Sequence, residues 1–216
     1  MLGIKINNQS RLKILCLGAH SDDIEIGCGG TILGMQKKYK DAMVYWVVFS
    51  SEPPRDREAR RSANLFLTDA GSRKILIENF RNGYFPYIGA DIKNYFESVK
   101  KIISPDIIFT HSRTDLHQDH RIVSELTWNT FRNHFILEYE IPKYDGDFGS
   151  PNVFVPLERS ICQKKAGYLL KCFKTQTVKH WFTEEIFIST LRIRGMECVS
   201  PTKYAEAFYS RKMLLL

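Results

Sequence analysis

The pattern of apolar and polar positions along the 216-residue chain predicts strands that alternate with helices. Continuous apolar runs, typical of strands covered on both faces, occupy residues 13–19, 42–50, 73–80 and 106–111. Stretches with helical spacing follow them, at residues 29–39, 56–67, 90–103 and 120–134. This order predicts an α/β fold: a Rossmann-like, mostly parallel sheet with helices on both faces.

The last third of the chain has a weaker pattern. Residues 141–152 are rich in Gly, Pro and Asp, which predicts a loop. Helices are expected at 158–173 and 183–195, and a closing strand at 203–210. No linker composition separates a second domain, so residues 1–216 are expected to form one domain.

Polar groups gather directly after two of the predicted strands. The segment "GAHSDDIEIGCGG" follows the first strand, and "HSRTDLHQDHR" follows the fourth. In an open α/β sheet, ligands bind outside the carboxyl ends of the strands. If the first and fourth strands are neighbours, this edge is the active site, where six side chains converge: His20, Asp22, Asp23, His117, Asp119 and His120.

These residue types suit a catalytic metal ion. His20, Asp23 and His120 offer two imidazoles and a carboxylate, a ligand set that leaves zinc an open position for water. Asp22 is then placed to take the proton of that water. A cationic His117 could stabilise an oxyanion or protonate a leaving amine, and Asp119 could accept a hydrogen bond from one of the imidazoles.

Three neighbouring features have other interpretations. His111 ends the fourth strand and is expected to be structural. The "GCGG" cluster lacks the ending of a P-loop, so it indicates close packing of the first helix against the sheet, or a substrate contact. The arginines after the second strand are expected to form a mostly solvated helix face from which one could bind a sugar hydroxyl or a phosphate; they are Arg55, Arg57, Arg60 and Arg61.

Together, "AHSDDIEIGCGGTI" and "TDLHQDHR" resemble the PIG-L/LmbE-like family of zinc-dependent N-acetylglucosamine de-N-acetylases. Further similarity lies in "REARRSANLFLTDAG", "KKAGYLLKCFKTQ" and "YAEAF", so the resemblance spans most of the chain. Ser21 and Gln118 stand where proline is usual in the family, and Thr175 where serine is usual. None of these departures removes a reactive group, although Ser21 and Gln118 bear on local rigidity.

The resemblance implies roles for individual residues. His20, Asp23 and His120 match metal ligands, Asp22 the general base, His117 the electrostatic or acid residue, and Asp119 the support of that histidine. The implied reaction removes the acetyl group from an amino-sugar conjugate, with Zn²⁺ or Fe²⁺ as cofactor. Two alternatives remain: an amidase acting on a thiol conjugate or a glycopeptide acyl chain, and a non-catalytic zinc- or sugar-binding protein.

The composition limits the classes of partner that the chain is expected to bind. The net charge of +7 is compatible with an acidic partner or with a solvated basic surface, but no nucleic-acid module is present. No apolar run approaches the roughly 20 residues of a membrane span, and no signal peptide is evident. Five scattered cysteines without a CxxC pair predict free thiols in the cytoplasm. The expected partner is a small-molecule substrate; the oligomeric state is open, a homo-oligomer included.

Overall fold

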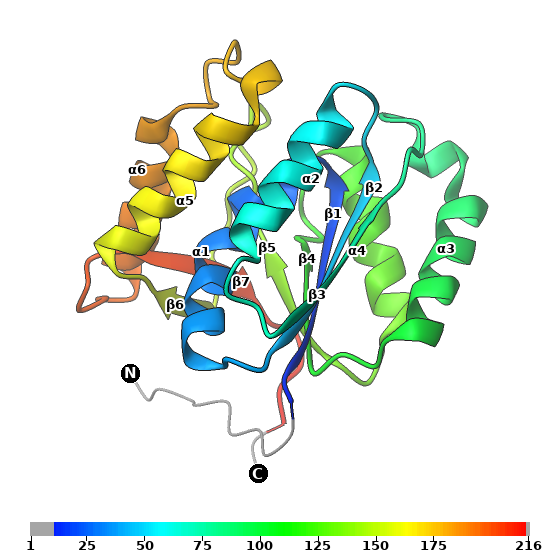
Figure 1. The fold of residues 1–216 in the computed structure, drawn as a ribbon, viewed down its shortest axis with the longest axis horizontal. Coiled ribbons are helices and arrows are strands. Elements are labelled where there is room, and N and C mark those ends of the chain that lie inside the picture. The colour runs from blue at the N-terminus through cyan, green and yellow to red at the C-terminus, as the bar shows by residue number, and fades with distance from the viewer. Residues whose placement is uncertain (1–10, 215–216) are drawn as a thin grey trace.

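The computed structural model describes residues 11–214 and is built around one sheet (Figure 1). Its strand order is β3-β2-β1-β4-β5-β7-β6, and the first five strands are parallel while β7 runs antiparallel to both of its neighbours. The strands are β1 (Lys13–His20), β2 (Met43–Ser50), β3 (Ser72–Ile77), β4 (Ile107–His111), β5 (Phe135–Tyr139), β6 (Val153–Pro156) and β7 (Ala205–Tyr209). The predicted adjacency of the first and fourth strands is therefore confirmed.

Helices cover both faces of the sheet, as Figure 1 shows. One side carries α1 (Asp23–Lys38), α2 (Arg55–Phe66), α5 (Arg159–Cys172) and α6 (Glu184–Glu197). The other carries α3 (Gly89–Ile102) and α4 (Gln118–Thr130), and two 3₁₀ turns are η1 (Phe85–Tyr87) and η2 (Lys174–Gln176). The predicted Rossmann-like, mostly parallel α/β fold is confirmed.

The central strand shows why the apolar runs are continuous. Ile14 and Cys16 of β1 belong to the core on the α1 side, whereas Leu15 and Leu17 belong to the core on the α3 side. Successive side chains of a strand point to opposite faces, and both faces of β1 are covered. After the exposed Lys13, every residue of the strand is therefore buried up to its end at His20.

Three elements differ from the sequence prediction. Helix α1 begins at Asp23, six residues before the predicted start, although its first turns hold glycines with low helix propensity. Tertiary packing stabilises these turns and overrides the local preference. Strands β5 and β6 were not predicted, because one follows the predicted helix almost directly and the other has only four residues on the sheet edge.

The glycines of α1 allow the helix to lie unusually close to its neighbours. A Cβ on Gly27 would fall 2.2 Å from the ring of Tyr139, and one on Gly29 would fall 2.5 Å from Phe66. A Cβ on Gly30 would lie 2.6 Å from Leu157. The close-packing interpretation of the "GCGG" segment is thus confirmed.

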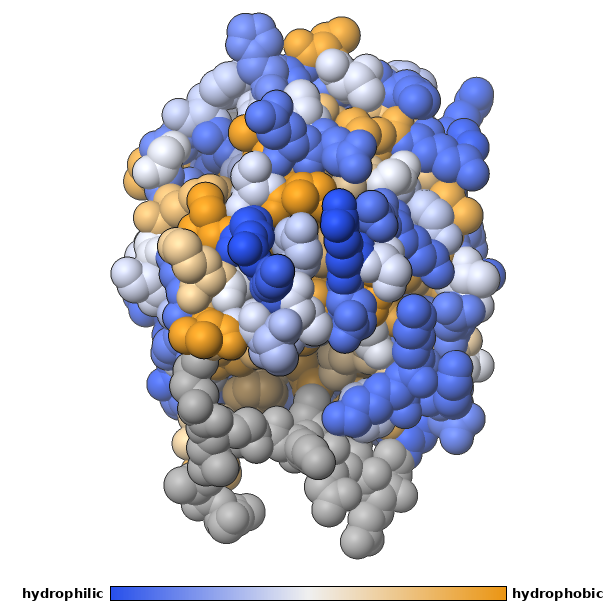
Figure 2. Space-filling model, turned by 90° about the vertical axis from the view of Figure 1, so that its left-hand side faces the viewer, coloured by the Kyte–Doolittle hydropathy of each residue, from blue (hydrophilic) through white to orange (hydrophobic). Residues whose placement is uncertain are grey.

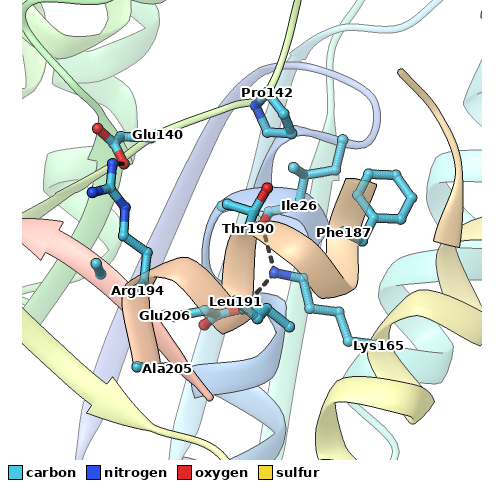
Figure 3. Close-up of a pocket in the computed structure, with 12 residues that line it drawn as sticks. Ile26, Glu140, Pro142, Lys165, Phe187, Thr190, Leu191, Arg194, Ala205 and Glu206 are labelled. Atoms are coloured by element: carbon cyan, nitrogen blue, oxygen red, sulfur yellow. Dashed lines mark hydrogen bonds and ion pairs between the residues drawn. The ribbon is translucent and has the colours of Figure 1, made fainter. Parts of the chain in front are cut away.

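A buried ion pair bonds to the backbone of the same helix (Figure 3). Lys165 of α5 donates to the carbonyl oxygen of Ile26 and to the carboxylate of Glu206, both at 2.6 Å. Glu206 of β7 accepts from the backbone amides of Gly30 at 2.8 Å and Thr31 at 2.6 Å. The adjoining hollow, about 30 Å³, has room for about one water molecule. The pair therefore holds in place the helix that begins at Asp23.

The surface of residues 11–214 shows no single feature that identifies a partner. Figure 2 looks onto the side that carries α5 and α6, where hydrophobic and hydrophilic residues are interspersed. Between residues 11 and 214, no helix has the length and apolar character needed to cross a membrane. All five cysteines are free, as expected. The single-domain boundary of 1–216, the cytoplasmic location and the homo-oligomer stay predictions, and residues 1–10 and 215–216 lie outside the described residues.

We expect Gly27→Ala to destabilise the protein by about 2 kcal/mol, because its methyl group would force α1 away from Tyr139. Gly34→Ala in the same helix is the matched control: its Cβ would lie 3.8 Å from Ile161, an ordinary contact, so alanine should stabilise α1 by up to about 1 kcal/mol. Urea unfolding of both variants measures the difference. Equal stabilities would contradict the close-packing account.

Candidate active site

The polar residues at the ends of β1 and β4 line one pocket of about 270 Å³. Five of the six predicted side chains reach its wall: His20, Asp22, Asp23, His117 and His120. Asp119 is fully buried behind them. The remaining wall includes Arg55 and parts of the segments 140–152 and 177–183. The predicted convergence at the carboxyl edge of the sheet is therefore present.

Local backbone geometry directs the two aspartates apart. Asp22 is the N-cap of α1 and has a left-handed conformation with φ 90°. Asp23 follows as the first helical residue, and its Oδ2 accepts the amide hydrogen of His20 at 2.6 Å. Asp23 consequently faces back toward the end of β1, whereas the Asp22 carboxylate meets Arg55 on the pocket wall.

Three atoms form a compact set of potential metal ligands. Nδ1 of His20 lies 3.1 Å from Nε2 of His120, and each of them lies 3.6 Å from Oδ2 of Asp23. Tetrahedral nitrogen and oxygen ligands of zinc are about 3.3 Å apart. The second nitrogen of each imidazole is held by a carboxylate: His20 by Asp119 at 3.1 Å and His120 by Asp115 at 2.9 Å. Such partners commonly orient metal-binding histidines, so the residues fit a divalent ion.

The charges in this cluster balance one another. Although burial alone lowers the pKa of His20, its hydrogen bonds to Asp119 and Asp23 raise it to about 9. Burial, together with the neighbouring imidazole of His111, lowers the pKa of His120 to about 3. Despite burial, electrostatic interaction with the imidazoles of His120 and His111 and hydrogen bonding to His20 keep the pKa of Asp23 well below its usual value. One protonated imidazole thus compensates the buried carboxylates, a task that a bound cation would take over.

Asp22 has the environment of a proton acceptor. Burial raises the pKa of this carboxyl to about 7, although the charge of Arg55 opposes the shift. Nη2 of Arg55 donates to Oδ1 of Asp22 at 3.0 Å and to the carbonyl oxygen of Ser21 at 2.6 Å. Of the four arginines expected on a solvated helix face, Arg55 is therefore part of the site.

Asp119 and His117 are paired differently from the expectation. The Asp119 carboxylate accepts from His20 and from the backbone amides of Gly83 and Phe85, and only the Asp119 amide contacts His117, donating to its Nδ1 at 3.2 Å. Burial and the charge of His20 lower the pKa of His117. A neutral His117 with its hydrogen on Nε2 follows, in place of the expected cation.

Two residues that sequence reasoning did not assign belong to the site. Asp115 accepts from the amide of His117 at 2.8 Å and from Nζ of Lys143 at 3.1 Å, in addition to its bond with His120. Asp115 could have been identified from its position inside the "TDLHQDHR" motif. Lys143 comes from the predicted 141–152 loop, whose composition is compatible with a lid or a substrate contact but singles out no individual residue.

His111 fits the structural role expected for it. Its Nε2 accepts the amide hydrogen of Ala19 at 2.9 Å, so the lone pair that a metal would need is already engaged. Its ring stacks on that of His120 at a centroid distance of 3.9 Å. Among the described residues, two further sets bring ligand atoms within 4.8 Å of one another: His20, His117 and His120, and Asp23, His111 and His120. Because Nε2 of His111 already accepts from Ala19, His117 is the stronger competitor as third ligand.

Comparisons with known proteins identify the family and the fold of the chain. The family model described as PIG-L, GlcNAc-PI de-N-acetylase, matches residues 15–131. Among solved structures, a conserved protein of Thermus thermophilus is 18% identical, with a TM-score of 0.75 over 95% of this chain and 97% of that one. The N,N′-diacetylchitobiose deacetylase of Pyrococcus horikoshii is 20% identical, with a TM-score of 0.65 over 92% and 83%.

The fold is also shared with the 4-carboxy-2-hydroxymuconate hydratase GalB of Pseudomonas putida. It is 17% identical, with a TM-score of 0.74 over 95% of this chain and 98% of that one. At such identities the structural likeness shows the fold alone, and chemistry has to be inferred from the site.

We expect Asp115→Asn to weaken divalent metal binding by about 10- to 100-fold, because it replaces the carboxylate that orients His120. Asp147→Asn is the matched control: Asp147 also accepts from Lys143, and within residues 11–214 no histidine is paired with it. Competition with a chromophoric chelator measures both affinities. An equal loss in the two variants would show that loop anchoring, rather than the orientation of His120, governs metal affinity.

Proposed function

Since the chain belongs to the PIG-L (GlcNAc-PI de-N-acetylase) family and is thereby an N-deacetylase, we propose that it hydrolyses the acetamide of an N-acetylglucosamine-type conjugate with a divalent metal ion. The observation that carries the proposal is the triangle of His20, Asp23 and His120 atoms beside the carboxylate of Asp22. The N,N′-diacetylchitobiose deacetylase, which shares the fold, acts on an acetylated sugar. This supports an acetylated amino sugar as the substrate class.

His20, Asp23 and His120 would hold the metal. Two imidazoles and one carboxylate suit either zinc or ferrous iron, and no thiolate is required. When bound, such an ion acts as a Lewis acid that makes water more acidic and polarises a carbonyl oxygen. The carboxylates of Asp119 and Asp115 keep the two imidazoles oriented for this task.

Asp22 acts as the general base. Its carboxylate accepts a proton from the attacking water and hands it to the departing amine. A carboxyl with a pKa near 7 can do both at neutral pH, since neither protonation state is strongly disfavoured. Arg55 holds the carboxylate at the pocket wall throughout the cycle.

His117 stabilises the negative charge that develops on the acetyl oxygen. Its Nδ1 accepts the amide hydrogen of Asp119, so the neutral ring carries its hydrogen on Nε2 and can donate it into the pocket. This donor is fixed before the reaction because His117 caps α4. Asp22 then remains as the group that delivers a proton to the amine.

We expect Asp22→Asn to keep its metal and to lose about 10²- to 10⁴-fold in turnover, because the amide cannot accept the proton of water. His120→Ala should lose the metal itself. Metal content by atomic spectroscopy and acetate release from a panel of N-acetylglucosamine conjugates provide the measurements. An active Asp22→Asn variant would rule out the base assignment.

The third ligand can be tested separately. We expect Asp23→Asn to lower metal affinity by at least about tenfold, whereas His117→Gln should retain the metal and lower turnover. Chelator competition and acetate release on the same two variants distinguish the ligand sets. Metal loss in His117→Gln with retention in Asp23→Asn would establish the three-histidine set instead.

The acetate assay also separates the broader alternatives. Release from one conjugate, abolished in Asp22→Asn, establishes the reaction and its substrate class. Hydrolysis of only thiol conjugates or glycopeptide acyl chains would identify an amidase of the same fold. A metal-loaded protein that binds these sugars and hydrolyses none of the amides would be a binding protein.

A further inference from the structure

The segment 177–183, between η2 and α6, forms the outer wall of the active-site pocket through Lys179 and Trp181. Phe182, which follows directly, is buried and packs against the rings of Phe173 and Phe187. The amides of Lys179 and Phe182 close two successive turns, donating to Gln176 and Lys179. The two pocket residues are thus presented by a segment with a buried anchor.

A second anchor joins this segment to the catalytic wall. Thr175 donates to Glu58 of α2 through its backbone amide at 3.0 Å and through its hydroxyl at 2.6 Å. Helix α2 begins with Arg55, which holds Asp22. Lys179 is therefore tied, through the contact of Thr175 with Glu58, to the helix whose first residue holds the base.

Besides its histidines, the pocket is lined by three lysine and arginine side chains, two of which are already paired with carboxylates. Arg55 pairs with Asp22, and Lys143 donates to Asp115 and Asp147. These ion pairs hold the catalytic groups and the 140–152 loop in place. They leave little positive charge for a ligand.

Lys179 differs from both. Its ammonium lies 5.3 Å from the centroid of the Trp181 ring, and within residues 11–214 no carboxylate is paired with it. A cation–π contact positions an ammonium without neutralising its charge. Asp145 also lines the pocket but is exposed, so solvent screens its charge more than that of the Lys179 ammonium.

We propose that the amino-sugar substrate carries an anionic group, a phosphate or a carboxylate, and that Lys179 binds this group. The inference rests on the proposed function and narrows its substrate class. The reacting acetamide lies at the inner wall with His20 and Asp22, and the anion lies at the outer wall with Lys179. Trp181 provides a flat apolar surface beside the ammonium, against which the C–H groups of a sugar can pack.

The test compares anionic and neutral substrates of one sugar. The anionic arm contains N-acetylglucosamine 1-phosphate, N-acetylglucosamine 6-phosphate and N-acetylmuramic acid, and the neutral arm contains methyl N-acetylglucosaminide. The first three distinguish a phosphate from a carboxylate. Acetate release by the metal-loaded protein gives kcat and KM for each, at low and at high salt.

The variants are Lys179→Met, Lys179→Arg and a matched control, Lys164→Met. Lys164 of α5 also has its ammonium near an aromatic ring, 5.5 Å from Tyr168, but it does not line this pocket. We expect Lys179→Met to raise KM about tenfold for the preferred anionic sugar and to raise it far less for the neutral sugar. Lys179→Arg should restore the KM, the control should match the parent protein, and salt should reduce the preference for the anion.

Equal KM values for neutral and anionic sugars in the parent protein would overturn the inference. So would a Lys179→Met variant that raises KM equally for both. If no sugar releases acetate, the proposed function fails, and calorimetric binding of the same sugars then decides about Lys179. If the anionic sugars bind more tightly than the neutral sugar and Lys179→Met abolishes this difference, Lys179 is the anion-binding residue. If anionic and neutral sugars bind equally, the inference is wrong.

Discussion

The close approach of α1 to the sheet is the constraint on which the site depends. Because Gly27, Gly29 and Gly30 have no side chain, the helix lies at a position where a larger residue would collide with its neighbours. The pair of Lys165 and Glu206 then bonds to the backbone of the same turns. A buried ion pair adds little net stability by itself, but its hydrogen bonds with the helix backbone specify one position of α1. That position determines where the first residues of the helix place their carboxylates.

Charge compensation explains why the site is assembled as one unit. Each carboxylate of the cluster has an imidazole partner: Asp119 has His20, Asp115 has His120, and Asp23 contacts both. Removing one member leaves its partner buried and unpaired, which costs more than the pair contributes. Effects of substitutions here should therefore be strongly non-additive. A cation that binds between the imidazoles and Asp23 would also stabilise the folded state, since the unfolded chain offers no such set.

The sequence predicted those parts of the structure that depend on the hydrophobic pattern of nearby residues. Buried parallel strands are continuous apolar runs, and their carboxyl ends meet at one edge, so β1, β4 and the polar groups after them could be predicted. The start of α1 could not, since its glycine-rich first turns are stabilised by Tyr139 and Glu206, which are more than 100 residues away in the chain. The same holds for Lys143 and Lys179, whose roles arise only from where loops fold back. The sequence identified Asp119 as a site residue but not His20 as its partner, because the motif places more than one imidazole within reach of Asp119.

The division of labour between Asp22 and Asp23 follows from one backbone angle. A non-glycine residue at φ 90° is strained by about 1–2 kcal/mol, and aspartate tolerates this region better than most residues. The left-handed step lets consecutive carboxylates face different surroundings, one the imidazole cluster and the other Arg55. Ser21, which stands where proline is usual in the family, contributes rigidity by other means: its hydroxyl donates to Ser51 at 2.7 Å and its carbonyl oxygen accepts from Arg55. Only the hydroxyl bond is specific to serine, because proline offers the same carbonyl oxygen to Arg55. The bond to Ser51, directly after β2, therefore gives the turn a tether that a proline ring would not supply.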